Sequence, residues 1–191
     1  MACSKKPRDW QRVAAACLRR AALACACLAA SACGLLMHQS PGVLDVRNAQ
    51  LVVQDGAAHL ELALDCQLSG PMQDALDHGI PLAIVVDVRG ADVVRATANV
   101  ELRYYPLSRR YQLAVNGRDD ERGFATRGYL LAALGSLRIG LPATFAQAAA
   151  PLRVSAALDP AQLPGALRLP ALFEPAWRMS SAETTWSPAA H

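Results

Sequence analysis

The chain has 191 residues, which suits one domain with a leader or tail and is too short for two ordinary domains. Apolar residues make up 53% and charged residues 18%, a balance that excludes an intrinsically disordered chain. The net charge of +3 arises in residues 1–32, which carry six Lys and Arg against one Asp; the rest carries 13 Arg against 15 acidic residues. Because the body is slightly acidic, we expect no nucleic-acid partner.

Residues 1–32 have the pattern of an export signal. A basic segment ends at Arg19-Arg20, an apolar segment covers residues 21–32, and Ala30-Ser31-Ala32 is a small-residue cleavage pattern. The apolar run has the length of a signal-peptide core, whereas a membrane-spanning helix needs about 20 residues. If the run is extended to Met37, an uncleaved membrane anchor is the alternative. We therefore expect an exported protein of the periplasm.

Cys33 follows the small-residue pattern directly. Residues 28–34, Leu-Ala-Ala-Ser-Ala-Cys-Gly, resemble a bacterial lipobox, although Ala30 stands where that pattern usually has Leu. On this hypothesis a lipid on Cys33 tethers the mature chain to a membrane, with Gly34 favouring the outer membrane, and stable anchoring takes more than one acyl chain. The alternative is that Cys33 is one more small apolar residue of a Cys-rich leader.

A single domain is expected after a short linker at 33–42. It covers residues 43–187 and leaves a tail at 188–191. Cys66 is the only cysteine of this domain, so no disulfide can form within it. Its position in an alternating apolar segment predicts a small core residue.

Alternating apolar and polar residues predict strands through most of the domain. Asp55-Gly56 predicts a tight hairpin turn between the first two strands, and Asn116-Gly117 is a similar turn signal. Pro106 is expected to end the longest strand, since proline cannot donate to a strand ladder. The predicted strands cover residues 43–53, 60–68, 82–88, 94–104, 111–115 and 152–158.

Two helices are expected between these strands. One is capped by Ser69 and stopped by Gly79, and the other is capped by Thr126 and closed by Gly135. A third short turn is expected after Pro142. The sequence therefore predicts a mainly β fold, α+β by count, with one β-sandwich-like domain of antiparallel strands and two or three short helices.

Catalytic and metal-binding motifs are missing. The four histidines are not at ligand spacing, and phosphate-binding, zinc-protease and serine-hydrolase motifs do not occur. We therefore expect no catalytic residue, no metal and no cofactor. A spatial cluster of His59 or His78 with a serine or Cys66 leaves an unrecognised hydrolase as a third-ranked hypothesis.

Aromatic and basic residues mix in residues 103–111. Such side chains can stack on sugars or bases, which makes Tyr105, Arg109 and Tyr111 candidate binding residues, together with Trp177 and Trp186. The alternative is a pair of strands with half-buried tyrosines and solvated arginines. For the two tryptophans the alternative is a last strand in which Trp177 faces the core.

Six segments occur in an order that resembles a known family. They lie at residues 47–56, 75–82, 102–111, 124–135, 158–164 and 177–186. Together they are similar to the DUF4390 family of exported proteobacterial proteins, whose function is not established. The resemblance implies no known catalytic residue. Family members are often encoded beside a membrane sensor kinase of the nitrogen-regulation type, which implies an envelope signalling partner.

We therefore expect a non-catalytic envelope protein that binds a protein partner. Its membrane contact would come from the leader or from a lipid. The second hypothesis is a periplasmic domain that binds a small ligand or glycan through exposed aromatic side chains.

Overall fold

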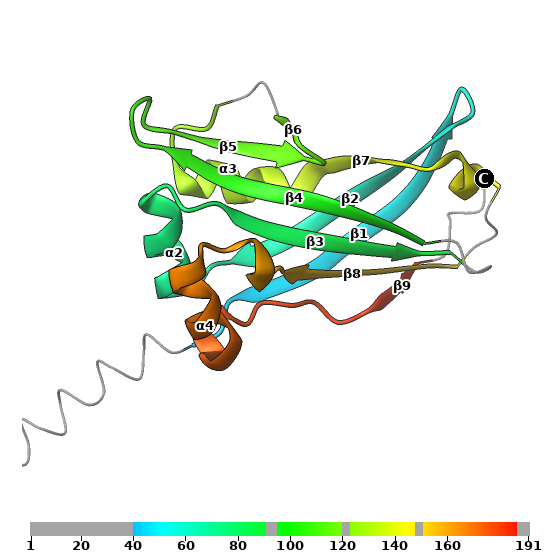
Figure 1. Ribbon diagram of the computed structural model, residues 1–191. Coiled ribbons are helices and arrows are strands. Elements are labelled where there is room, and N and C mark those ends of the chain that lie inside the picture. Colours follow the sequence, from blue (N-terminus) through cyan, green and yellow to red (C-terminus); the bar gives the residue numbers. More distant parts are fainter. Residues whose placement is uncertain (1–39, 91–94, 120–122, 148–150, 187–191) are drawn as a thin grey trace, which may run out of the picture. The chain divides into compact units, whose positions relative to one another are not determined.

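The computed structural model describes residues 40–90, 95–119, 123–147 and 151–186. Within these residues two antiparallel sheets have the orders β1-β2-β7 and β6-β5-β4-β3-β8-β9 (Figure 1). The smaller sheet contains β1 (Val43–Gln54), β2 (Ala57–Gln67) and β7 (Leu137–Leu141). The larger contains β3 (Leu82–Arg89), β4 (Arg95–Tyr105), β5 (Arg110–Val115), β6 (Arg118–Asp119), β8 (Leu152–Leu158) and β9 (Thr184–Trp186).

Short helices join and cover these strands. The α-helices are α2 (Gly70–Asp77), α3 (Arg127–Ala133) and α4 (Gly165–Phe173). The 3-10 helices are η1 (Leu134–Ser136), η2 (Ala143–Ala146), η3 (Pro160–Gln162) and η4 (Pro175–Trp177). No helix in the described part of the chain is both long and apolar enough to span a membrane.

The predicted strand-rich α+β fold is confirmed. The structure is only loosely consistent with the predicted β-sandwich, because one sheet has three strands and the other has six. One apolar core nevertheless contains buried side chains of both sheets, among them Leu60 and Leu62 from β2 and Ile84 and Val86 from β3. Burial of these side chains is the main favourable term in folding.

The β1–β2 hairpin follows the predicted turn. Asp55 and Gly56 have positive φ values of 52° and 77°, which suit the right-handed twist of a two-residue hairpin. Alternate β2 residues from Ala58 to Cys66 are buried, as expected for a strand with one face on the core. In β1 the strand register shifts between Val46 and Asn48, a bulge that the sequence pattern did not reveal.

Helix α2 covers one end of the core. The Ser69 hydroxyl accepts a hydrogen bond from the Met72 amide at 3.4 Å, and Gly79 takes the positive φ of 82° that ends the helix. Met72 and Leu76 are fully buried. Both predicted signals are therefore confirmed, and burying each of these side chains contributes about 1.5–3 kcal/mol.

Three local predictions were wrong or incomplete. Helix α3 begins after the predicted cap at Thr126, but it continues as η1 through Gly135, which has no positive φ and does not close it. Trp177 lies in η4 and not in a last strand; the final described strand is β9, seven residues further on. Strand β7 and helix α4 were not predicted, because a five-residue strand and a helix containing Pro170 give weak patterns.

Candidate functional site

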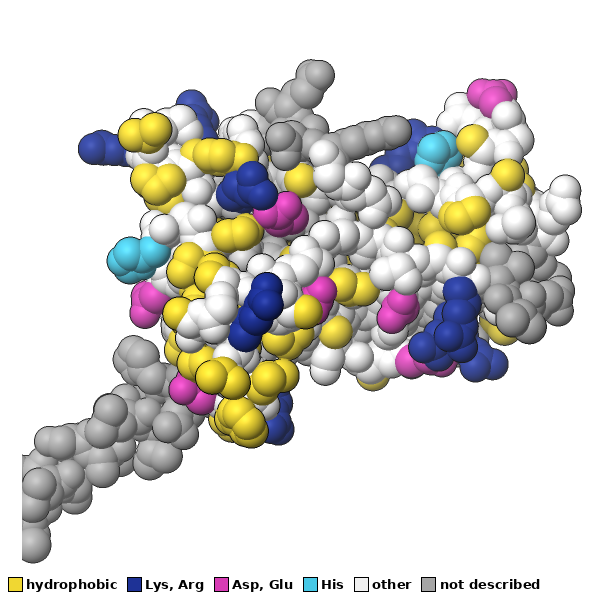
Figure 2. All heavy atoms as spheres, in the orientation of Figure 1, with side chains coloured by type: hydrophobic (Ala, Val, Ile, Leu, Met, Phe, Trp, Pro, Cys, Tyr) yellow, Lys and Arg dark blue, Asp and Glu magenta, His cyan; other side chains and the backbone are white. Residues whose placement is uncertain are grey.

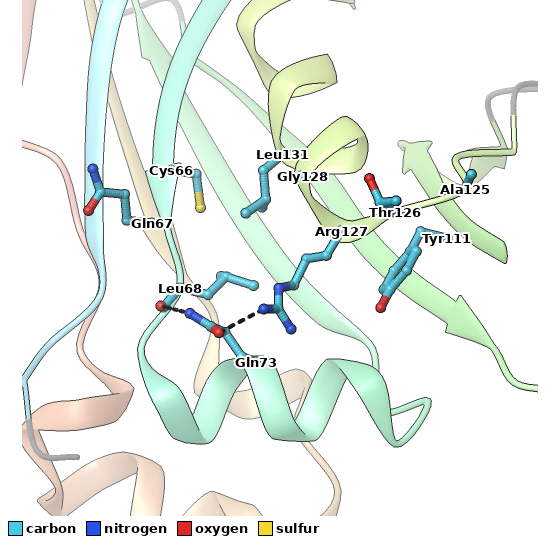
Figure 3. A pocket seen from close by; sticks show the side chains of 10 residues that line it. All are labelled: Cys66, Gln67, Leu68, Gln73, Tyr111, Ala125, Thr126, Arg127, Gly128 and Leu131. Atoms are coloured by element: carbon cyan, nitrogen blue, oxygen red, sulfur yellow. Dashed lines mark hydrogen bonds between the residues drawn. The ribbon is translucent and has the colours of Figure 1, made fainter. Parts of the chain in front are cut away.

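A hollow of about 710 Å³ lies between α2 and α3, beside β2 and β5 (Figure 3). Its apolar side is formed by Cys66 and Leu68 at the end of β2 and by Leu131 of α3. Its polar side is formed by Gln73, Tyr111 and Arg127. The hollow therefore combines apolar surface with a few polar groups, as binding sites for small molecules and peptide side chains do.

The polar side chains of the hollow bond to one another through α2. Arg127 donates from Nη1 to Asp77 Oδ2 at 2.6 Å and from Nη2 to Gln73 Oε1 at 2.9 Å, and Gln73 Nε2 donates to the Leu68 carbonyl at 2.7 Å. Tyr111 Oη donates to Asp77 Oδ1 at 2.7 Å. Figure 3 shows Arg127 reaching from the start of α3 toward Gln73 on α2. This network joins α2, α3 and β5.

Tyr111 is a half-buried member of the network. Its ring lies 4.6 Å from that of Tyr104, its cross-strand partner, at a tilt of 39°. Burial and the hydrogen bond to Asp77 raise the pKa of Tyr111 to about 12. The phenol therefore stays protonated at neutral pH and acts as a hydrogen-bond donor.

Cys66 borders the same hollow from the core side. The side chain is buried, and its Sγ lies 3.8 Å from Met179 Sδ, so the predicted core position is confirmed. Burial, with a smaller contribution from the charge of Asp65, raises the pKa of Cys66 to about 12. Because the thiolate is the nucleophile, Cys66 is unreactive at neutral pH.

The predicted residues of the β4–β5 hairpin lie on different faces. Tyr111 pairs with Tyr104 across the two strands and faces α2. Tyr105 directly follows Tyr104 in β4, so its side chain points to the opposite face of the sheet. Arg103 packs over the Tyr105 ring at 5.8 Å from its centroid and donates to its Oη at 3.1 Å. Arg109 is exposed in the hairpin turn with a φ of 52°.

The two tryptophans do not complete an aromatic patch. Trp177 is buried, with 4% of its surface exposed. Trp186 lies on β9, and its partly buried ring packs against the core. Three strands separate β9 from β5 in the sheet. Trp186 also lies near the start of β4, close to the level of Arg95, whereas Tyr111 pairs with Tyr104 at the other end of that strand. These aromatic residues therefore do not form the single exposed patch that the second hypothesis requires.

His59 and His78, the two histidines in the described part of the chain, make no hydrolase-like cluster with Cys66. His78 is exposed, and its Nδ1 lies 2.6 Å from the Asp74 carbonyl of its own helix, where it caps α2. His59 occupies the β2 face opposite to that of Cys66. Among the described residues, no three His, Cys, Asp or Glu side chains lie close enough to hold a metal ion. The candidate lipidation residue Cys33 lies outside the described residues.

Residues 43–187 match the family model described as domain of unknown function DUF4390. The chain belongs to this family. The match covers the range predicted for the domain, and it confirms the resemblance found in the sequence. No curated protein and no solved structure is significantly similar to the chain.

Sequence reasoning identified only Tyr111 among the polar residues of the hollow. Gln73 and Asp77 are four residues apart, on one face of α2. This spacing could have indicated from the sequence that the helix has a polar face. Arg127 directly follows the cap of α3. Its partners are about 50 residues away in the sequence, so nothing local indicates the contact.

Replacing Asp77 with Ala should loosen the contact between α2 and α3. Two hydrogen bonds to a partly exposed carboxylate are lost, so we expect the free energy of unfolding to fall by about 1 kcal/mol. Asp74→Ala is the matched control, since this exposed residue on the same helix makes neither of these bonds. The measurement is urea unfolding, and equal effects of the two substitutions would contradict the role of the network.

The domain should lose stability at alkaline pH. Cys66 and Tyr111 have ordinary pKa values of 9.0 and 10.0, and the fold raises both to about 12. The unfolded chain therefore releases these protons first, and stability falls as pH rises from about 9 to 12. The double variant Cys66→Ala and Tyr111→Phe should show a shallower loss in thermal unfolding followed across this range. A parallel pH profile would exclude these two groups as the cause.

Proposed function

We propose that the protein is an exported, membrane-tethered envelope module that acts by binding a protein partner and not by catalysis. The leader at residues 1–32 and the lipobox-like segment at Cys33 support export and tethering. The hollow between α2 and α3 is the proposed contact site. A membrane sensor kinase is the first candidate partner, because the family resemblance implies an envelope signalling role.

The internal pairing of the polar groups is the observation that carries this proposal. Arg127 and Tyr111 already bond to Asp77 and Gln73, so a partner that excludes water from the hollow leaves these groups satisfied. Leu131 supplies apolar contact beside them. A general acid or base would instead need a group that exchanges a proton near neutral pH. The pKa values of the Cys66 thiol and the Tyr111 phenol are both raised to about 12, so both groups keep their protons at neutral pH.

Binding of a small ligand is the second candidate function. The hollow falls within the size range of small-molecule sites, about 300–1,000 Å³, and Tyr111 contributes to its lining. The other predicted aromatic residues do not line it. Native mass spectrometry of the protein released from cells distinguishes this function, since a retained small molecule that is lost in Tyr111→Ala would favour it.

A photoreactive residue in place of Ala125 should form a covalent adduct with the partner in living cells. Ala125 is exposed at the hollow, so the probe reaches a docked protein without filling the site. The same probe in place of Ala57 is the matched control, because Ala57 is exposed beside the β1–β2 turn. We expect an adduct with an envelope protein, identified by mass spectrometry, from position 125 and not from 57.

Equal adducts from the two positions, or none from either, would contradict docking at the hollow. The identity of the adduct decides between a sensor kinase and another envelope protein.

The intact mass of the mature protein tests the tether. We expect a chain that begins at Cys33 and carries a lipid, and Cys33→Ser should remove the lipid and release the chain from the membrane fraction. An unmodified chain that begins at or after Cys33 would show a free periplasmic domain. A chain that keeps its leader would show an uncleaved anchor.

A further inference from the structure

Helix α4 presents an apolar face that the rest of the domain does not cover. Leu169, Leu172 and Phe173 are 66%, 58% and 75% exposed, and their spacing places them on one side of the helix. Ala171 is buried on the other side. Figure 2 shows hydrophobic side chains gathered over this helix. A single exposed apolar side chain is ordinary, but three together mark a contact surface.

The β4–β5 hairpin tip lies at the same end of the domain as α4 (Figure 1). Helix α2 lies between the hairpin tip and α4. Gly79, at the end of α2, packs so closely on the hairpin turn that an added Cβ would lie 3.5 Å from Pro106. Helix α2 also contacts η4, which follows α4. Leu107 at the tip is fully exposed, with Arg109 and Arg110 beside it. We use the name end face for the exposed apolar side chains of the hairpin tip and of α4, which are Leu107, Leu169, Leu172 and Phe173.

The described chain begins at this end. A Cβ at Gly42 would lie 3.2 Å from Met72 Sδ of α2 and 3.1 Å from Met179 Sδ, just after η4. The nine residues from 34 to 42 span at most about 30 Å. A lipid on Cys33 would therefore hold Gly42, and with it this end of the domain, near a bilayer, and an apolar run anchored as far as Met37 would shorten the connection.

The charges beside the end face nearly balance one another. Arg109, Arg110, Arg168 and Arg178 are exposed there, and Arg168 uses its Nε to donate to the Leu163 carbonyl at 2.8 Å. The carboxylates of this end are Asp74, Asp77, Asp159 and Glu174; Asp77 pairs with Arg127, and Asp159 caps η3. The balance is only weakly positive, so insertion of apolar side chains supplies most of the attraction.

We propose that the end face docks on the surface of a phospholipid bilayer, with Leu107, Leu169, Leu172 and Phe173 at the boundary between headgroups and acyl chains. This inference rests on the membrane tether of the proposed function. A tether gives the domain a high effective concentration at the bilayer, so a weak apolar contact is enough to orient it. Docking fixes which sides of the domain remain open to a protein partner.

The test uses the full chain, purified from cell membranes and reconstituted with vesicles of phosphatidylethanolamine and phosphatidylglycerol. A photoreactive benzoyl-phenylalanine replaces Leu172. In the matched control it replaces Val53, which is 50% exposed beside the β1–β2 turn at the opposite end (Figure 1). Flotation of the vesicles measures the tether, and the phospholipid adduct measures docking. We expect both samples to float and only the probe at position 172 to capture lipid.

A second variant tests the contribution of the apolar face. Leu169→Ser with Phe173→Ser should lower the lipid adduct from position 172 about tenfold, whereas Val53→Ser should leave it unchanged. The substituted side chains are exposed, so the melting temperature should stay that of the parent chain. An unchanged adduct in the folded double variant would overturn the role of α4.

The remaining outcomes separate the two proposals. A chain that floats but captures no lipid at position 172, or captures as much at position 53, keeps the tether and overturns docking. A chain that neither floats nor captures lipid contradicts both. A protein adduct from position 172 in intact cells would assign the end face to a protein partner and overturn the lipid contact.

Discussion

The packing of α2 against the end of the core is the interaction on which the rest of the structure depends. Met72 and Leu76 are fully buried in the core that both sheets share, and the polar face of the same helix binds Arg127 through Gln73 and Asp77. Its C-terminal turn lies against the β4–β5 hairpin. One short helix therefore closes the core, forms a wall of the hollow and supports the end face.

The chemistry of the hollow follows from this packing. Side chains that are reactive in other proteins are here held in their protonated or ion-paired forms, because burial penalises the charged state and neighbouring groups satisfy the donors. Cys66 and Tyr111 both keep their protons far above neutral pH. At neutral pH Tyr111 therefore presents the hollow with a hydrogen-bond donor, and Cys66 presents it with a neutral thiol.

Much of the fold could be predicted because its signals are local. The alternation in β2, the Asp55-Gly56 turn and the Ser69 cap each depend on a few neighbouring residues. The hollow was largely missed, since Arg127 meets Asp77 only when two helices distant in sequence come together. The aromatic residues do not form a single patch for a related reason. Tyr111 on β5 and Trp186 on β9 belong to the same sheet, but three strands separate β5 from β9.

The sequence by itself determined the strand-rich fold and the core position of Cys66, because both are encoded in residue type and periodicity, and its six ordered segments were enough to indicate the family. Only the tertiary structure decided the bulge in β1, the pairing of Arg127 with Asp77 and the exposure of α4. The physical reason is that Leu169, Leu172 and Phe173 have the composition of core residues. Whether an apolar side chain is buried depends on what packs against it, and that is set by elements far away in the chain.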